Sequence, residues 1–221
     1  MSRKAAYFDV DGTLVHGNIV HNYAFFARNP GSVGEAFGRT VGLLASIPVL
    51  YAADLVDRKA FNEVFYRNYK GLSEDRLRFL ADEHFEKIMK PNIYRQGLDL
   101  VRQCRDAGCL IVLVSGSLDF IIEPLARYLK VDECVTNRLE IIDGYATGRL
   151  QRPVMAGAMK SKWMREHARR EDVDLEQSFA YSDSYSDYPM LSVVGHPTAI
   201  NPDLQLRTIA RSLDWPLLQF D

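Results

Sequence analysis

The sequence predicts an α/β protein in which a doubly wound parallel sheet carries an inserted α-helical cap. Apolar runs that fit buried strands alternate with helical segments through residues 97–210. The run at 109–114 has no polar alternation, as expected for a strand covered on both faces of a parallel sheet. A block of helical periodicity interrupts the alternation after the first strand. We therefore expect a core formed by 1–15 and 95–221, with the helical cap at 16–94.

Local sequence signals justify each element in order. The apolar run 4–9 fits a first strand, and cap residues such as Phe61, Val64 and Phe65 recur at helical spacing. Asp143 and Gly144 favour a hairpin turn. The cap helices are expected to break at 29–32, 71–73 and 90–92. Later strands are expected at 109–114, around Cys134, at 178–181 and at 198–200, with a hairpin at 138–150. Helices are expected at 97–107, 119–129, 157–170 and after 203.

Composition limits the classes of protein to consider. The chain has 221 residues and a net charge of −2, so it has no basic excess to attract nucleic acid. Its three cysteines cannot all pair within one chain and show no CxxC spacing, which indicates reduced thiols in a cytoplasmic protein. No signal peptide precedes the first strand. We expect a cytoplasmic protein that binds a small molecule and no nucleic acid, and the sequence leaves its oligomeric state open.

The segment Val41–Val56 is almost wholly apolar and has two interpretations. It is shorter than the roughly 20 residues that a membrane-spanning helix needs, and it contains Pro48 and Asp54. We expect a buried or partly buried helix pair that is broken at Pro48. The alternative is an exposed apolar surface that touches lipid or an apolar substrate. Stable membrane insertion is not expected.

Two carboxylates, Asp9 and Asp11, stand two residues apart at the end of the first strand, before Gly12 and Thr13. Like charges this close repel each other, and burial would raise at least one pKa. A cation such as Mg²⁺ would relieve the repulsion, because hard cations prefer oxygen ligands. An ionised carboxylate beside such a metal can act as a nucleophile toward phosphorus. The alternative is an acidic turn, since Asp and Gly are common turn residues.

Polar residues also follow two later strands. Ser115 and Gly116 follow the run at 109–114, and Asp183 follows the strand at 178–181. Open α/β sheets bind ligands beyond the carboxyl ends of their strands, so we expect these groups to meet the first acidic pair. Asp183 would join that pair in binding the metal. The Ser115 hydroxyl and the Gly116 N–H can hold phosphate oxygens.

Two further residues complete the parts that phosphoryl transfer needs. Lys160 lies near the start of a helix and would neutralise charge on the nucleophile and the phosphate. Asp187 would hold Lys160 in place or bind the metal through water. Each part also has an ordinary structural interpretation: a helix cap for Ser115, a solvated basic face for Lys160, and a capping turn for the acids at 183 and 187.

Taken together, these motifs resemble the haloacid dehalogenase superfamily of aspartyl phosphohydrolases, in particular the phosphoserine-phosphatase-like branch with a helical cap, subfamily IB. DVDGT at 9–13 matches the first motif and VSGS at 114–117 the second. Lys160 matches the third, and SDSYSD at 182–187 the fourth. The order and spacing match over essentially the whole chain. The resemblance implies a Rossmann-like core and a phosphatase activity.

The resemblance also implies a role for each motif residue. Asp9 would be the nucleophile that forms a phosphoaspartate, and Asp11 the general acid and then the general base. Mg²⁺ would bind Asp9, the backbone carbonyl of Asp11, and Asp183. Ser115 and Lys160 would hold the transferring phosphoryl group. Asp187 would support Lys160 and the metal.

The sequence departs from the family pattern in two places. In the fourth motif, Ser184 and Ser186 replace the usual Gly and Asn, which would alter the surroundings of the metal. Phosphoserine phosphatases also place a Glu shortly after the first motif to hold the substrate ammonium. The aligned stretch, 16–21, has no acid. An ammonium without a carboxylate partner would be held weakly, which argues against phosphoserine itself.

Five polar residues of the cap are candidates for substrate contacts. His16, Asn18 and His21 could reach the site from the cap, or could be ordinary polar residues of a helix N-terminus. Arg58 and Arg67 could meet a substrate carboxylate or second phosphate, or could lie on a solvated helix face.

The function that we expect is Mg²⁺-dependent hydrolysis of a small phosphorylated metabolite, with the cap closing over the site. An alternative with the same chemistry is a phosphatase of a lipid-like or apolar phosphate. A phosphotransferase is a further alternative, because the phosphoaspartate can pass its phosphate to an alcohol. A non-catalytic phosphate-binding module is disfavoured, since every residue that the chemistry needs is present.

Overall fold

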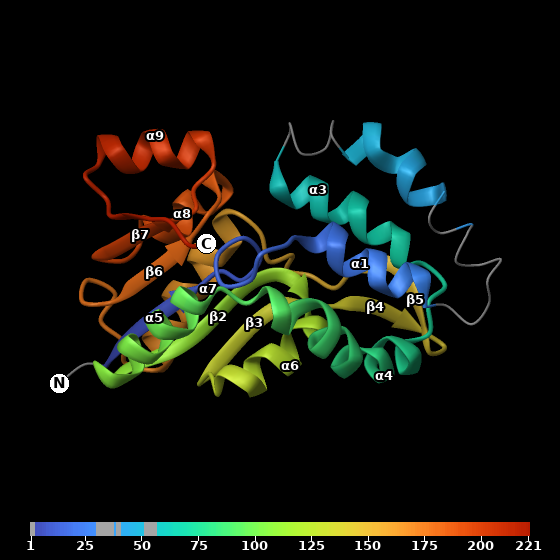
Figure 1. Ribbon diagram of the computed structural model, residues 1–221, viewed down its shortest axis with the longest axis horizontal. Helices are drawn as coiled ribbons and strands as arrows, with labels where there is room; N and C mark the ends of the chain where they lie inside the picture. The colour runs from blue at the N-terminus through green and yellow to red at the C-terminus, as the bar shows by residue number, and fades with distance from the viewer. Residues whose placement is uncertain (1–2, 30–37, 39–40, 51–56) are drawn as a thin grey trace.

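The computed structural model describes residues 3–29, 38, 41–50 and 57–221, and it confirms the α/β class (Figure 1). Six strands form one parallel sheet in the order β3-β2-β1-β6-β7-β8. These strands are β1 (Lys4–Phe8), β2 (Cys109–Leu118), β3 (Glu133–Asn137), β6 (Phe179–Ser182), β7 (His196–Ile200) and β8 (Leu217–Leu218). The first strand therefore pairs with two strands that follow the cap in the sequence.

Helices cover both faces of this sheet, and the side chains of β1 show why. Ala6 and Phe8 join one apolar cluster, whereas Ala5 and Tyr7 join another on the opposite face. The helices α5 (Arg95–Asp106) and α6 (Asp119–Leu129) contribute to the first cluster. The helices α7 (Ala158–Arg170), α8 (Tyr188–Leu191) and α9 (Leu204–Ser212) contribute to the second. Burial on both faces explains why the strands read as continuous apolar runs.

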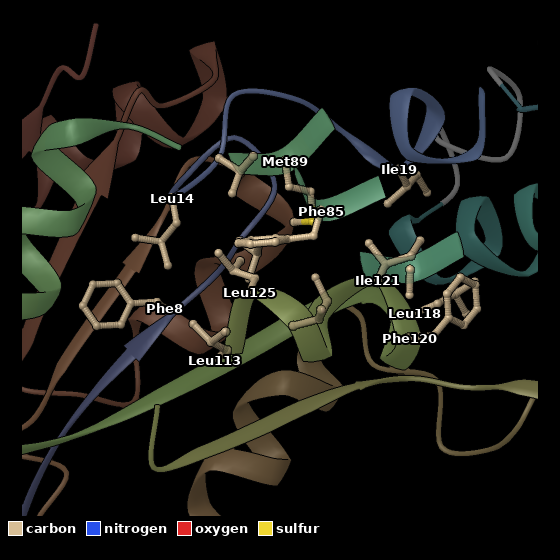
Figure 2. Close-up of a cluster of buried hydrophobic side chains, with 14 of the residues drawn as sticks. Phe8, Leu14, Ile19, Phe85, Met89, Leu113, Leu118, Phe120, Ile121 and Leu125 are labelled. Atoms are coloured by element: carbon tan, nitrogen blue, oxygen red, sulfur yellow. The ribbon is translucent and has the colours of Figure 1, made fainter. Parts of the chain in front are cut away.

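The cap follows β1 and is helical throughout its described residues. It contains α1 (Ile19–Arg28), a helix at 41–50, α3 (Arg58–Phe65), α4 (Glu74–His84), and the short helices Tyr66–Tyr69, Phe85–Met89 and Lys90–Asn92. Its aromatic side chains join the first core cluster; the rings of Phe26 and Phe120, for example, meet edge to face at 5.3 Å. Figure 2 shows cap residues such as Ile19 and Phe85 beside Leu118 and Leu125 of the core.

A two-stranded hairpin, β4 (Leu139–Ile142) and β5 (Tyr145–Leu150), was predicted and is confirmed. Asp143 and Gly144 both have positive φ, as the tightest hairpin turns require. The hairpin packs on the cap rather than on the sheet: the Ala146 N–H donates to the Leu72 carbonyl at 2.9 Å. The boundary between core and cap stays a prediction.

Two strands differ from expectation. β2 continues to Leu118. Ser115, Gly116 and Ser117 therefore lie near the end of the strand instead of after it. A shift in register after Val114 allows this continuation, because Leu118 still finds Asn137 as its partner on β3. β8 was not predicted, since a strand of two residues is too short to show a period.

The expectation for the apolar cap segment was wrong in two respects within residues 41–50. These residues form one helix that continues through Pro48. Leu44, whose carbonyl loses its helical donor there, is 60% exposed, so water can replace the missing N–H. The side chains are mainly exposed instead of buried, although Leu50 is buried. Residues 51–56 lie outside the described residues.

Across the described ranges, every helix is too short or too polar to span a bilayer. The three cysteines are free thiols, as expected. The expected cytoplasmic location stays a prediction.

Candidate active site

The carboxyl ends of β1, β2 and β6 meet at one cavity of about 310 Å³, which we call the reaction cavity. The topology explains the convergence, because β1 pairs directly with both other strands. The cavity is lined by six of the seven predicted site residues: Asp9, Asp11, Gly116, Lys160, Asp183 and Asp187. The structure therefore brings six of the predicted residues together at one cavity, and their roles stay predictions.

Lys160 is the centre of a buried ionic triad. Its Nζ donates to Asp9 Oδ1 at 2.6 Å and to Asp187 Oδ2 at 2.7 Å. All three side chains are less than 10% exposed. Burial alone would lower the pKa of Lys160, but the carboxylates of Asp187 and Asp9 raise it above its ordinary value. The ammonium is thus permanently charged and fixed beside one oxygen of Asp9.

Asp187 holds Lys160, which was one of its two predicted roles. Its Oδ2 also accepts a hydrogen bond from Ser182 Oγ at 2.8 Å. In the same loop, the Ser184 hydroxyl accepts from the Ser186 N–H at 3.3 Å and so supports the turn. The two serines that depart from the family pattern therefore hold the loop of the fourth motif in a hydrogen-bonded turn.

Asp11 is turned away from the triad. Its Oδ2 accepts from Ser117 Oγ at 2.6 Å, and its Oδ1 accepts from Asn22 Nδ2 at 3.1 Å. Burial raises the pKa of the Asp11 carboxyl above its ordinary value, although these two hydrogen bonds act in the opposite direction. Asp9 and Asp11 therefore occupy different environments, as a nucleophile and a proton carrier require.

Asp183 stands on the other side of Asp9. Thr13 Oγ1 lies 3.2 Å from Asp183 Oδ1 and 3.5 Å from Asp9 Oδ2, so one hydroxyl reaches both carboxylates. Burial, and then the charges of Asp9 and Asp187, raise the pKa of Asp183. Gly12 makes this approach possible, because a Cβ at that position would lie 2.2 Å from Asp183 Oδ2.

These oxygens fit Mg²⁺. In the described part of the chain, no three Cys, His, Asp or Glu side chains gather into a metal cluster. The predicted set needs only two carboxylates, those of Asp9 and Asp183, together with the backbone carbonyl of Asp11. The buried carboxylate of Asp9 and the half-buried one of Asp183 repel each other across one hydroxyl, and both are hard oxygen donors.

Ser115 lies behind the cavity wall. It is fully buried, and its Oγ accepts from the Ser117 N–H at 3.0 Å. Its predicted phosphate contact stays a prediction. Gly116 does line the cavity, and its carbonyl is held by Tyr66 Oη at 3.0 Å and by Asn137 Nδ2 at 2.8 Å.

The cap residues named from the sequence divide between two cavities. Arg58 and Asn18 line the reaction cavity. Asn18 also caps α1 by accepting from the Val20 N–H at 3.0 Å, so its structural interpretation is confirmed as well. His16 and His21 line another cavity of about 460 Å³. It lies between α1 and the end of the cap at 88–92, and Asp11 also lines it. Arg67 is exposed and lines neither cavity.

Sequence reasoning missed several polar residues that the fold brings to the site. Asn22 and Ser117 hold Asp11, and Asn62 lines the reaction cavity from α3. Asn22 and Asn62 are polar residues buried within amphipathic helices. A polar residue on the apolar face of a helix was the available signal.

Comparison with known proteins agrees with this geometry. Residues 6–192 match the family model described as haloacid dehalogenase-like hydrolase. A putative hydrolase of Mycobacterium leprae is 33% identical over 98% of this chain and 72% of its own. Phosphoserine phosphatase SerB1 of Mycobacterium tuberculosis is 32% identical over 98% of this chain and 70% of its own. A protein of unknown function from Bordetella pertussis has a similar structure, with a TM-score of 0.82, 27% identity and 99% of each chain covered.

Proposed function

The chain belongs to the haloacid dehalogenase-like hydrolase family, and on this premise we propose that it hydrolyses a small phosphomonoester through a phosphoaspartate on Asp9, with Mg²⁺ as cofactor. One observation carries the proposal. A charged lysine holds one oxygen of Asp9, while Asp11, two residues away, is held separately by Ser117 and Asn22. This arrangement provides one nucleophile and one independent proton carrier.

In the first step, Asp9 Oδ2, the oxygen that Lys160 does not hold, attacks phosphorus and the bond to the leaving oxygen breaks. Burial raises the pKa of Asp9 to about 6, Lys160 limits that rise, and the ammonium offsets charge on the phosphoryl oxygens. Asp11, whose pKa is raised by burial, gives its proton to the leaving alcohol. Phosphate remains bound to Asp9 as an acyl phosphate.

In the second step, Asp11 takes a proton from water, whose oxygen attacks the phosphorus. The bond between phosphorus and Asp9 breaks, inorganic phosphate leaves, and the Asp9 carboxylate is restored. When bound, Mg²⁺ would be held by Asp9, Asp183 and the Asp11 carbonyl, and would supply positive charge near the phosphoryl oxygens.

The test is phosphate release from a panel of phosphomonoesters, measured with Mg²⁺, with EDTA, and with Mg²⁺ restored. We expect metal-dependent release by the parent protein and none by Asp9→Asn. Asp11→Asn should slow release by roughly 10²- to 10⁴-fold, the usual range for acid–base catalysis. Asp99→Asn is the matched control and should keep parental activity, because Asp99 is half-exposed and pairs with Arg102 on the surface of α5.

Mass spectrometry of denatured protein during turnover provides a second readout. A phosphate adduct on the parent chain, absent from Asp9→Asn, is expected. Normal turnover by Asp9→Asn would overturn the assignment of the nucleophile. Release that depends on an added alcohol acceptor would instead indicate a phosphotransferase.

A further inference from the structure

A second and larger cavity, about 1070 Å³, opens beside the reaction cavity, and we call it the outer cavity. Its walls are the start of α3 in the cap, the segment from Arg152 into the first turn of α7, the loop 184–186, and the residues at the start of α9. Figure 1 shows α3 and α9 on facing sides of the molecule, above the sheet. The two cavities share Arg58, Ala156, Ser184, Ser186 and Asp203, so they adjoin each other along these residues.

The size of the outer cavity is informative. It matches the range of about 300–1,000 Å³ that is typical of sites for whole organic ligands. The phosphoryl group occupies the reaction cavity, where Asp9 and Lys160 lie. The space beyond Arg58 is therefore available to the leaving group, and a leaving group as small as serine would fill only a minor part of it.

The outer cavity is electropositive. Three cations line it: Arg58, Lys59 and Arg152. Its two acids are already engaged by helix starts. Asp57 Oδ1 accepts from the Ala60 N–H at 2.6 Å, and Asp203 accepts from the backbone N–H groups of Tyr185 and Leu206 at 2.7 and 2.8 Å. With three cations and two acids, the lining side chains carry a formal net charge of +1.

The cations reach both ends of the space. Arg58 lines both cavities. Burial raises the pKa of the Asp11 carboxyl, and the positive charge of Arg58 partly offsets that rise. Arg152 lies at the outer end, where its Nη2 is 3.8 Å from Glu63 Oε1. Both partners of that pair are exposed, at 78% and 38%, so the pair is weak and a ligand anion can compete for Arg152.

The face of α3 carries an independent sign of a ligand site. Asn62 lies one helical turn after Arg58, on the same face, and is 98% buried against the reaction cavity. Its Oδ1 has no hydrogen-bond partner among the described residues. A buried acceptor without a donor costs stability, and a substrate donor would satisfy it once a rotation of the side chain turns Oδ1 into the cavity.

Between the two ends, the segment before α7 supplies an apolar wall. Pro153, Val154 and Met159 line the outer cavity there. Such a wall suits the carbon body of a ligand, and the few polar groups around it fix the orientation.

We propose that the outer cavity is a leaving-group subsite, which takes an extended organic leaving group that carries its own anion, a carboxylate or a second phosphate. Arg58 and Arg152 bind the anion, and Asn62 accepts a hydrogen bond from the part of the substrate near the ester. The inference deepens the proposed function and rests on it. It also explains why the stretch 16–21 needs no acid: the substrate is recognised by its negative charge.

The test uses alkyl phosphates that differ in length and in terminal charge. Ethyl, butyl and hexyl phosphates are compared, each ending in a carboxylate, a phosphate, a hydroxyl or an ammonium. We expect kcat/KM to be highest for the anionic termini, with a preference over the hydroxyl that grows from ethyl to hexyl. Loss of one charge-assisted hydrogen bond in Arg152→Gln should reduce this preference by roughly 10- to 100-fold for the hexyl esters. Arg58→Gln should reduce it for the short esters too.

The matched control is Arg67→Gln, which removes an exposed cap cation that lines neither cavity and should leave the preference at the parental value. Different outcomes would count against the subsite and against the phosphatase activity. Phosphate release with equal kcat/KM for anionic and hydroxyl termini would overturn the subsite and leave the phosphatase intact. A preference that survives Arg58→Gln and Arg152→Gln together would also overturn it. No release from any ester would overturn the proposed function and the subsite with it.

Discussion

His84 provides a sharp test of how the cap is packed. The side chain lies on α4, is fully buried, and stacks on Phe26 at 5.1 Å with Phe25 at 5.3 Å. Neither ring nitrogen has a hydrogen-bond partner within the described ranges. Burial lowers the pKa of His84 from 6.5 to about 4. The imidazole is therefore neutral in the folded protein at every pH above that value.

This pKa predicts the acid sensitivity of the fold. Between pH 6.5 and about 4 the unfolded chain binds a proton at His84 that the folded chain does not. Stability therefore falls as pH falls through this window and is fully present above it. At about pH 5, the two pKa values correspond to a loss of about 2 kcal/mol relative to about pH 7.5. A difference of that size corresponds to a shift of roughly 4–8 °C in the melting temperature of a chain this long.

His84→Leu removes the titrating group and keeps nearly the same volume. Urea denaturation of both proteins at about pH 7.5 and about pH 5 measures the effect, because other titrating groups cancel in the difference. We expect the variant to lose about 2 kcal/mol less than the parent on acidification. At neutral pH it should be at least as stable, since two unpartnered nitrogens are gone. The exposed His21→Leu is the control. Equal acid sensitivity of parent and His84→Leu would refute the reasoning.

Three further changes test the site. Ser117→Ala removes the 2.6 Å hydrogen bond to Asp11, and kcat should fall by about 10- to 100-fold in steady-state assays, as for other bonds to charged groups. Lys160→Met leaves buried carboxylates unpaired, so we expect inactivity and a loss of about 3–5 kcal/mol in urea denaturation; parental stability would contradict this. Gly12→Ala drives a Cβ against Asp183 and should lower kcat/KM by about 10²-fold, whereas Gly108→Ala, also at positive φ but in open space, should not.

The residues that the core brings to this cavity could be predicted from the sequence, because the carboxyl ends of parallel strands lie along one edge of the sheet. Asp9 and Asp183 stand directly after a strand, and Gly116 lies among the last residues of one, so their places in the sequence determine their places at the sheet edge. Asp9, Gly116 and Asp183 line one cavity for this reason. Lys160 could be predicted because its helix begins at the same edge.

The cap was harder to predict because its residues reach the site through tertiary packing. Nothing in the local sequence says that α3 turns Asn62 toward Gly116, where a Cβ would come within 3.2 Å of Asn62 Nδ2. Periodicity identified the helix but not which neighbour its polar positions meet. The helix at 41–50 shows the same limit: its apolar residues predicted burial, whereas Leu44 and Ile47 are more than half exposed.

The contacts of Asp11 explain why cap and core must be considered together. One oxygen of this carboxylate is held by Ser117 of β2 and the other by Asn22 of α1. The proton carrier therefore takes its orientation from both parts of the molecule. A movement of α1 away from the sheet would release one oxygen of Asp11 and leave the Asp9–Lys160 pair untouched, because that pair belongs wholly to the core. In the proposed mechanism, the position of the cap would therefore act on proton transfer by Asp11 and leave the nucleophile Asp9 in place.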